Sequence, residues 1–205
     1  MKSDGPNLEM RREPQQVRSQ ARIDRILKVA EQMIVDKGLA QLSVREVARL
    51  ADTNIATFYQ FFPNRAALVR RIVEKHQALL AETIDDAITD SQASDIRGAF
   101  RTLQARTLAF YKANPVTTEI WPGTHADHTL RAVNNTDNQA NIARIAELIH
   151  VFKPDADPDL VRKTAMLVLV TTAPVIRYCV TLPENLTEGI LDLHLDQVVF
   201  TLSSI

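Results

Sequence analysis

Apolar residues recur at helical spacing along most of the chain, and no segment alternates cleanly between apolar and polar positions. From Ile23 to Ile34 the apolar residues stand three or four positions apart, as they do on one face of an amphipathic helix. Ser19 is a residue type favoured at helix N-caps, and Gly38 is one favoured just beyond a helix C-terminus. The pattern predicts an all-α protein with about nine helices.

A second, shorter helix is predicted to begin after Ser43. Glu46 stands three residues later, which completes the capping-box pattern. Asp52-Thr53-Asn54 interrupts the apolar spacing after about two turns. Because Asp and Asn tolerate left-handed geometry and cap helices, we expect a tight turn there.

Two further helices are predicted directly after this turn. The first runs from Ile55 to about Phe61, and Pro63-Asn64 ends it and caps the next. The next begins at Arg65 and keeps helical spacing to about Asp90. Three helices with a tight turn between the second and the third are typical of a helix-turn-helix unit.

The rest of the chain continues in the same helical style. The Asn-rich stretch 134–138 is a poor helix former, so a break is possible inside the helical pattern of residues 125–152. The expected helical segments are 94–113, 125–152, 157–182 and 183–203, with a short segment near residues 115–123.

Composition excludes several classes of protein. The five glycines stand far apart, which excludes the glycine-rich phosphate loops of P-loop and Rossmann proteins. The single cysteine, Cys179, excludes an internal disulfide and any multi-cysteine zinc site. The most apolar stretch, 165–176, is shorter than the roughly 20 residues that a bilayer span needs. We therefore expect a cytoplasmic protein with no membrane partner and no cofactor.

Charge is distributed unevenly along the chain. Residues 1–75 hold 14 Lys/Arg and 9 Asp/Glu, a balance of +5, whereas residues 76–205 hold 10 and 16, a balance of −6. The two balances sum to the net charge of −1. A basic first third indicates that this end of the chain meets a polyanion.

The basic third also carries a specific motif. It consists of Val47-Ala48 through Ala51, then Asn54, Thr57-Phe58-Tyr59, Phe62-Pro63, Arg65 and Leu68. In order and spacing these residues closely resemble the N-terminal signature of the tetracycline-repressor (TetR) family. The resemblance covers residues 19–70 and implies a dimeric DNA-binding transcriptional regulator with a small-molecule effector.

Six positions depart from the usual family pattern, and two of them, Ile55 and Ala56, stand where the family often has a polar residue or Gly. Asp52 replaces the usual Gly, Thr53 an aliphatic residue, Asn54 a Ser and Arg65 a Lys. Asp can occupy a left-handed turn and Asn caps a helix as well as Ser, so the fold tolerates these changes.

Residues of the predicted third helix are suited to reading bases. A recognition helix needs small or medium-sized side chains near its N-terminus to reach base edges in the major groove. Gln60 suits adenine, Ile55 or Ala56 suits a thymine methyl group, and Tyr59 and Ser43 offer hydroxyl groups to phosphates. The candidate DNA-binding residues are Arg22, Ser43, Arg45, Asn54, Ile55, Ala56, Thr57, Tyr59, Gln60 and Arg65. The alternative is that three of them, Arg22, Tyr59 and Gln60, are ordinary solvated surface residues.

Sites in the acidic part rest on weaker patterns. The resemblance implies an effector pocket there and a dimer interface on the last two helices. Candidate pocket residues are Phe100, Phe110, Trp121, His125, Phe152 and Tyr178, although aromatic residues at helical spacing are commonly plain core. Candidate interface residues are Leu169, Ile176, Leu191, Leu195, Val198 and Leu202. His125 and His128 have the one-turn spacing of a metal pair, but a lone pair of histidines is more often structural, so no metal is expected.

These patterns predict three parts. Residues 1–18 form a disordered basic arm, 19–66 a helix-turn-helix DNA-binding domain, and 67–205 a helical ligand-binding and dimerisation domain. Double-stranded DNA, a second copy of the chain and a small-molecule effector are the expected partners. The alternatives are a helical protein-interaction module and a small all-α enzyme, for which the sequence offers no recognisable catalytic arrangement.

Overall fold

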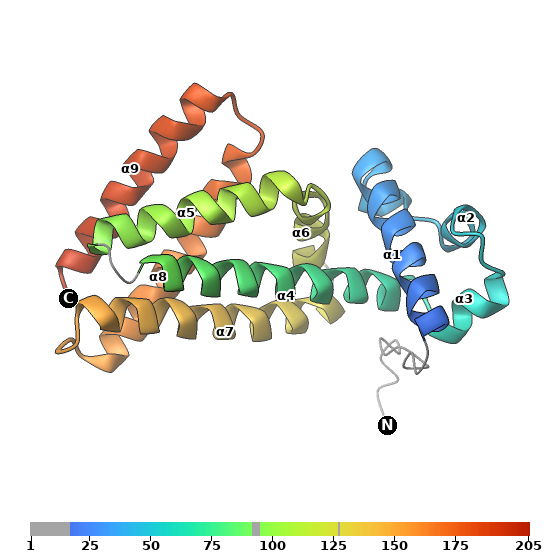
Figure 1. Ribbon diagram of the computed structural model, residues 1–205, viewed down its shortest axis with the longest axis horizontal. Helices are drawn as coiled ribbons and strands as arrows, with labels where there is room; N and C mark the ends of the chain where they lie inside the picture. The colour runs from blue at the N-terminus through green and yellow to red at the C-terminus, as the bar shows by residue number, and fades with distance from the viewer. Residues whose placement is uncertain (1–16, 92–94, 127) are drawn as a thin grey trace. The chain divides into compact units, whose positions relative to one another are not determined.

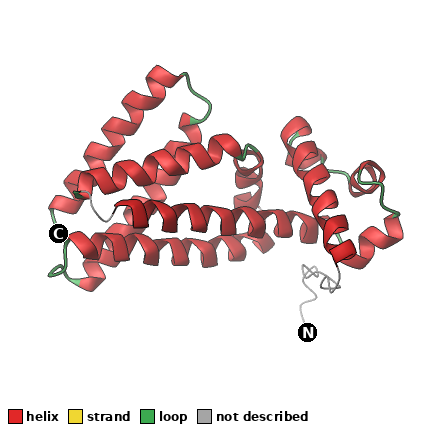
Figure 2. Cartoon of the chain, viewed as in Figure 1, coloured by secondary structure: helices red, strands yellow, loops and turns green. Residues whose placement is uncertain are grey.

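Helices form all the regular structure of the described residues (Figure 2). The computed structural model describes the backbone of residues 17–91, 95–126 and 128–205, and the side chains of residues 19–90, 95–121 and 138–205. The predicted arm, residues 1–18, therefore lies almost wholly outside the described residues. In chain order the helices are α1 (Val17–Lys37), the short 3-10 helix η1 (Leu39–Gln41), α2 (Val44–Leu50), α3 (Ile55–Phe61), α4 (Arg65–Ser91), α5 (Ile96–Ala113), α6 (Val116–Ala126), α7 (His128–Phe152), α8 (Pro158–Cys179) and α9 (Glu184–Ser203) (Figure 1). The prediction of an all-α fold is confirmed.

The chain divides into two compact units. The first comprises residues up to His76 and residues 115–133, and the second comprises residues 77–114 and 134–205. Helix α4 contributes its beginning to the first unit and its remainder to the second. None of the described helices is both long and apolar enough to cross a bilayer.

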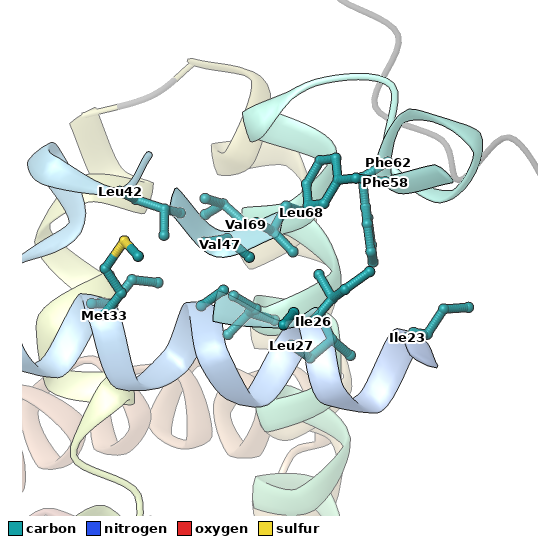
Figure 3. Close-up of a cluster of buried hydrophobic side chains, with 14 of the residues drawn as sticks. Ile23, Ile26, Leu27, Met33, Leu42, Val47, Phe58, Phe62, Leu68 and Val69 are labelled. Carbon is teal, nitrogen blue, oxygen red and sulfur yellow. The ribbon is translucent and has the colours of Figure 1, made fainter. Parts of the chain in front are cut away.

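The first unit is built around one apolar core. The buried faces of α1, α2, α3 and the start of α4 meet there, and α6 adds Val116 and Ile120 (Figure 3). Phe58 and Phe62 are fully buried and their ring centroids lie 5.4 Å apart. Burial of an aromatic side chain stabilises the fold by about 1.5–3 kcal/mol. This core holds the helix-turn-helix segment in one place on α1.

The second unit joins α5, α8 and α9 through mutual packing. Its larger cluster of buried side chains includes Phe100, Leu148 and Leu195, and a smaller one contains Phe110, Tyr111 and Ile176. Arg97 and Arg101 on α5 form ion pairs with Asp196 and Asp192 on α9, at 2.6 and 2.9 Å. Exposed ion pairs of this kind contribute little to stability, so burial of apolar side chains provides most of the stabilisation of this unit.

A polar contact crosses this unit as well. The ring nitrogen Nδ1 of His194 lies 2.8 Å from the amide nitrogen of Gln104, and Nε2 lies 3.4 Å from the hydroxyl of Thr171. Burial lowers the pKa of His194, so its ring is neutral near pH 7. A neutral imidazole is what these two contacts require, since one nitrogen accepts and the other donates.

Helix α7 differs from the expectation at the Asn-rich stretch. The helix runs without interruption from His128 to Phe152, although a break near residues 134–138 was possible on helix propensity. The later part of α7 buries Ile142, Ile145 and Ile149 in the core of the second unit. Tertiary packing of this kind routinely outweighs a few tenths of a kcal/mol of propensity per residue.

Candidate DNA-binding site

The turn between α2 and α3 is held by local hydrogen bonds. The hydroxyl oxygen of Ser43 accepts from the backbone N–H of Glu46 at 3.4 Å, as the capping-box pattern predicts. After α2, the N–H of Thr53 donates to the carbonyl of Ala48 at 2.9 Å. Asp52 adopts the left-handed conformation with φ of 49°, a geometry that Asp tolerates better than most residues. The chain therefore reverses within a few residues.

Helix α3 begins at a side-chain cap. The side-chain oxygen of Asn54 accepts from the N–H of Ala56 at 2.8 Å. This bond satisfies one of the backbone donors that the first turn of a helix leaves without an intrahelical partner. An Asn in the place of the usual Ser thus performs the same local role.

The two sides of α3 have opposite characters. Phe58 and Phe61 are 0% and 5% exposed, so they anchor the helix to the core. Ile55 and Tyr59, on the other side, are 39% and 41% exposed. Ala56 and Gln60 are also exposed, and Thr57 is half-buried. A short helix that is anchored on one side presents the other to a partner without further ordering.

The start of α4 is tied to the segment between α1 and α2. The side-chain oxygen of Asn64 accepts from the N–H of Ala67 at 2.8 Å and caps the helix. The guanidinium group of Arg65 donates to the backbone carbonyl of Leu39 in η1. An arginine has five N–H donors, so one such bond uses only part of its capacity. Arg65 is exposed and therefore remains accessible to a phosphate.

The ten sequence-predicted residues all lie in the first unit. Nine of them are exposed, and Thr57 is the exception. They are Arg22 on α1, Ser43 and Arg45 at the start of α2, Asn54 to Thr57, Tyr59 and Gln60 at α3, and Arg65 at the start of α4. The structure thus brings together, in one small unit, residues that span more than forty positions of sequence.

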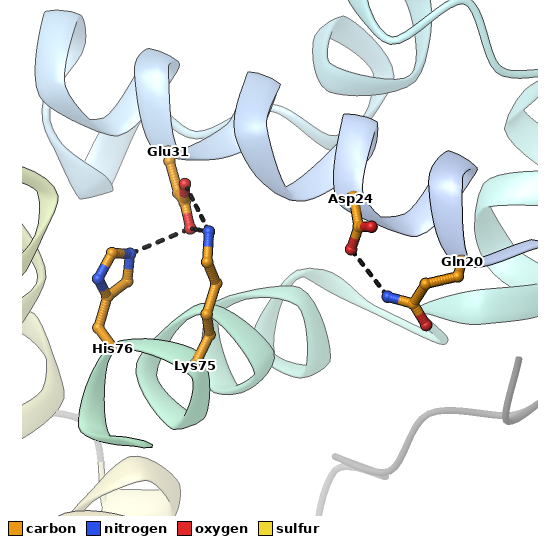
Figure 4. A network of polar contacts seen from close by, with 5 residues as sticks. All are labelled: Gln20, Asp24, Glu31, Lys75 and His76. Carbon is orange, nitrogen blue, oxygen red and sulfur yellow. Dashed lines mark hydrogen bonds and ion pairs between the residues drawn. The ribbon is translucent and has the colours of Figure 1, made fainter. Parts of the chain in front are cut away.

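Sequence reasoning missed one polar cluster in this unit. The carboxylate of Glu31 on α1 accepts from the ammonium group of Lys75 at 2.8 Å and lies 3.1 Å from Nε2 of His76 (Figure 4). Burial opposes ionisation of Glu31, but the hydrogen bonds from His76 and Lys75 outweigh it and lower its pKa below the ordinary value. Apolar periodicity does not reveal such a cluster, because Glu31 lies on α1 and its partners Lys75 and His76 lie on α4.

Comparison with known protein families identifies both parts of the chain. The model described as "Bacterial regulatory proteins, tetR family" matches residues 26–72, and the model described as "Tetracyclin repressor-like, C-terminal domain" matches residues 94–193. The chain belongs to the TetR family. It is therefore a transcriptional regulator with a helix-turn-helix DNA-binding unit. Among curated proteins, no sequence matches this chain.

Solved structures of TetR regulators share the fold. One from Streptomyces coelicolor is 21% identical, with a TM-score of 0.67 over 90% of this chain and 99% of that chain. One from Mesorhizobium loti, titled a putative TetR-family regulator, is 15% identical, with a TM-score of 0.70 over 90% and 98%. The fatty acid degradation regulator FadR from Bacillus halodurans is 19% identical, with a TM-score of 0.66 over 85% and 94%. At these identities the likeness shows the TetR fold alone.

Of the six residues predicted to line an effector pocket, five have described side chains, and these belong to both units. Phe100 and Phe110 are buried in two different clusters of the second unit, and Phe152 is half-buried beside the larger one. Tyr178 is 63% exposed on α8. Trp121 belongs to the first unit, and the side chain of His125 lies outside the described residues, as does that of His128. Phe100 and Phe110 thus occupy core positions, and the effector pocket stays a prediction.

Most of the residues predicted for the dimer interface are buried inside the subunit. Ile176, Leu195, Val198 and Leu202 are 0–4% exposed, and Leu169 and Leu191 are half-buried. A side chain buried inside one subunit has no surface left for a partner. Periodicity identified α8 and α9 as strongly apolar but did not separate their buried side from their exposed side.

Within the part of the chain that the structure describes, no three or more His, Cys, Asp or Glu side chains come close enough to hold a metal ion. The single cysteine, Cys179, is buried, and burial raises the pKa of its thiol. Such a thiol is protonated at neutral pH and therefore a weak nucleophile.

Proposed function

We propose that this TetR regulator is a repressor that binds a palindromic operator as a dimer and is released by a small molecule. The observation that supports it best is the two-sided α3, which is anchored by Phe58 and Phe61 and exposes Ile55, Tyr59 and Gln60. This helix follows a tight turn after α2 and belongs to the first 75 residues of the chain, which carry a charge balance of +5. These are the requirements for inserting a recognition helix into the major groove.

Base reading is assigned to the exposed side of α3. Gln60 has an amide that can accept from N6 and donate to N7 of one adenine. Ile55 and Ala56, at the start of the helix, offer apolar surface to a thymine methyl group. Asn54 and Thr57 flank them and complete the reading surface.

Phosphate contacts are assigned to residues around α3. The hydroxyl of Ser43 accepts a backbone hydrogen bond, so its hydrogen remains to be donated to a phosphate oxygen. Tyr59 offers a second hydroxyl, and the exposed guanidinium groups of Arg22, Arg45 and Arg65 supply positive charge. Contacts of this kind fix the position of a protein on the duplex without carrying sequence information.

A direct experiment tests the assignment to DNA. The purified protein is titrated onto duplexes that flank its own gene, in a mobility-shift assay at several salt concentrations. We expect a specific complex whose logarithmic affinity falls linearly with the logarithm of salt, because bound Lys and Arg displace counterions. Equal affinity for these duplexes and for random DNA would favour an interaction module that has kept the fold without an operator.

Dimer formation is supported by the outer surface of α8 and α9. One helix-turn-helix reads only a few base pairs, whereas two copies about a two-fold axis read a palindrome. Eight large apolar side chains are exposed on these two helices, more than on the rest of the described chain together. We call this surface the α8–α9 face; it comprises Leu160, Met166, Leu167, Val170, Tyr178, Leu186, Leu193 and Phe200. Exposed apolar clusters of this kind mark protein interaction sites.

The effector is assigned to the second unit and is proposed to be small and largely apolar. This unit has more apolar core than the reading of DNA requires. The fold-related FadR from Bacillus halodurans is a fatty acid degradation regulator, which agrees with an apolar ligand. Helix α4 belongs to both units along its length, so it is the element through which binding would alter the DNA-binding unit.

Fatty acids provide a first probe of this assignment. Decanoic and palmitic acid are tested by calorimetry with the free protein and by operator titration with the complex. Since only differential affinity shifts an equilibrium, a true effector must bind the free protein more tightly than the DNA-bound form. A compound that binds tightly without changing operator affinity would refute the coupling for that compound.

A further inference from the structure

One buried hydroxyl group in the second unit has no hydrogen-bond partner. Among the described side chains, only the hydroxyl oxygen of Thr172 and Nδ1 of His76 are buried without a hydrogen bond. A buried polar atom without a hydrogen bond lowers the stability of the fold, so each one calls for an explanation. Thr172 belongs to α8 in the second unit, which is the unit proposed to bind the effector.

Thr172 does not form the hydrogen bond that other helical threonines of this chain form. Five of them donate their hydroxyl hydrogen to the carbonyl oxygen four residues earlier, namely Thr83, Thr89, Thr102, Thr171 and Thr201. Such a bond within the helix is the common way for a threonine to satisfy its hydroxyl. Without it, the hydroxyl of Thr172 is available to a group from outside the helix.

Thr172 lies on the buried side of α8, between two apolar clusters. It follows Val168 by four residues and precedes Ile176 by four, which places all three on one side of the helix. Val168 is part of the larger cluster of buried side chains, and Ile176 is part of the smaller one. The hydroxyl therefore stands where the apolar interior of the unit is interrupted.

Polar residues mark the same boundary on α5 and α9. Gln104 and Thr107 are buried between the parts of α5 that contribute to the larger and to the smaller cluster. His194 is buried between the corresponding parts of α9. We call these three residues together with Thr172 the polar layer.

Contacts between helices hold His194 in the polar layer. Its Nδ1 lies 2.8 Å from the amide nitrogen of Gln104, and its Nε2 lies 3.4 Å from the hydroxyl oxygen of Thr171. Thr171 and His194 also line a hollow of about 620 Å³ that opens between α8 and α9. Thr171 is exposed, whereas the hydroxyl of its neighbour Thr172 is buried and unused by these contacts.

The described interior of the second unit offers no ionised partner to a ligand. Its buried polar residues are Gln104, Thr107, Asn141, Thr164, Thr187 and His194. Burial lowers the pKa of His194, so this ring is also neutral near pH 7. Arg177 is half-buried beside Tyr111, but it follows Thr172 by five residues and therefore lies on a different side of α8. A charged ligand group would lose its hydration there without gaining an opposite charge.

We propose that the hydroxyl of Thr172 binds the polar group of the effector, and that this group is a neutral hydroxyl or carbonyl oxygen. A threonine hydroxyl can donate to a carbonyl oxygen and can either donate to or accept from another hydroxyl. The apolar clusters on both sides of the polar layer suit the hydrocarbon part of such a molecule. The inference rests on the proposed effector and specifies its chemistry.

Matched alcohols and acids test the chemistry of the ligand. Binding of 1-octanol, 1-decanol, octanoate and decanoate to the full chain is measured by calorimetry near pH 7, and each compound is added to the operator complex. We expect each alcohol to bind at least about tenfold more tightly than the acid of the same length, because the carboxylate loses its hydration on burial. The alcohols should also release the operator at lower concentration than the acids.

Thr172→Val tests the residue, because valine has nearly the shape of threonine but no hydroxyl. We expect this variant to bind 1-decanol about fivefold more weakly, which corresponds to one hydrogen bond between neutral groups. We also expect a higher thermal midpoint of the ligand-free protein, since an unpaired buried hydroxyl is removed. Thr172→Ser keeps the hydroxyl and should keep most of the affinity.

Thr187 provides the matched control in the same unit. It is 3% exposed, and its hydroxyl donates to the carbonyl of Cys179 at 2.9 Å. Thr187→Val should therefore lower the thermal midpoint and leave the affinity for 1-decanol unchanged. The two valine variants thus differ in the direction of the stability change as well as in binding.

Three results would overturn the inference and leave the proposed effector standing. They are wild-type affinity of Thr172→Val for 1-decanol, tighter binding of the acids than of the alcohols, and a lower thermal midpoint of ligand-free Thr172→Val, which would show that water already satisfies the hydroxyl. A wild-type protein that binds none of the four compounds overturns both the inference and the proposed apolar effector.

Discussion

Gln60 is the longest polar side chain on the exposed side of α3, and a side-chain amide is the group that pairs with the major-groove edge of adenine. We expect Gln60→Ala to weaken the free energy of binding to the preferred operator by about 1–3 kcal/mol. The loss should be much smaller on a site in which the base pair that Gln60 reads is changed. Competition binding with a set of single-base-pair variants measures this. The same loss on every variant would show that Gln60 does not read a base.

Arg65 combines a contact inside the protein with a proposed contact to phosphate. Its guanidinium donates to the carbonyl of Leu39, and its position at the start of α4 is exposed. We expect Arg65→Ala to weaken binding to all sequences alike and to reduce the slope of logarithmic affinity against logarithmic salt by about 0.9. Titration at four or more salt concentrations gives the slope.

Arg65→Lys is the matched control, because lysine keeps the charge and lacks the planar fork of donors. It should keep the salt slope of the wild type. If Arg65→Ala lowers affinity with an unchanged slope, Arg65 acts only by fastening α4 to η1.

At the scale of the helices, the contact between α1 and α4 includes one charged cluster beside the apolar core. The side chain of Glu31 is 17% exposed and joins Lys75 and His76 (Figure 4). We expect Glu31→Gln to lower the free energy of unfolding by about 1–2 kcal/mol at pH 6, since bonds to a charged and partly buried acceptor are lost. Urea denaturation followed by circular dichroism measures it. Asp24→Asn, which removes the negative charge from the exposed acceptor of Gln20 and keeps an acceptor oxygen, should change stability by less than about 0.5 kcal/mol.

The pH dependence of this difference follows from the direction of the Glu31 shift. The folded-state pKa is lower than the ordinary value of 4.5, so the unfolded chain takes up the proton first as the pH falls. The stabilisation is complete above the ordinary value and is lost as the pH falls through the folded-state pKa. The difference between wild type and Glu31→Gln should therefore narrow below pH 4.5, and a difference that is constant down to the acid transition would contradict the role of the charge.

At the scale of the whole molecule, the α8–α9 face is the proposed dimer surface. Phe200 is 78% exposed and borders the hollow between the two helices. We expect Phe200→Asp to yield monomers at micromolar concentration, because a carboxylate in an apolar interface loses its hydration without gaining a partner. Sedimentation velocity measures the mass. These monomers should bind a half-site weakly and lose preference for the palindrome.

Val151 offers a matched control for this prediction. It is 57% exposed but lies on α7, outside the α8–α9 face. Val151→Asp adds the same charge at a similarly exposed apolar position, so the protein should remain a dimer. Dissociation by both substitutions would show that net charge, rather than the face itself, controls assembly.

The sequence by itself determined the fold class and the local structure of the DNA-binding unit. Spacing of three and four between apolar residues dictates helices, and Ser43, Asp52 and Asn54 have few other low-energy roles than caps and turns. Their hydrogen bonds and the left-handed φ of Asp52 agree with that prediction. Local interactions fix such features, because both partners lie within a few residues of each other.

Only the tertiary structure decided which face of α8 and of α9 is buried. Val198 and Phe200 are equally apolar in sequence, yet one is 4% and the other 78% exposed. Likewise, the contact of Glu31 with Lys75 joins residues 44 positions apart, and nothing near either residue specifies it. Apolar side chains lie on several sides of α8 and α9, so periodicity alone does not identify their buried side. Packing against the other helices of the second unit separates the buried residues from the α8–α9 face.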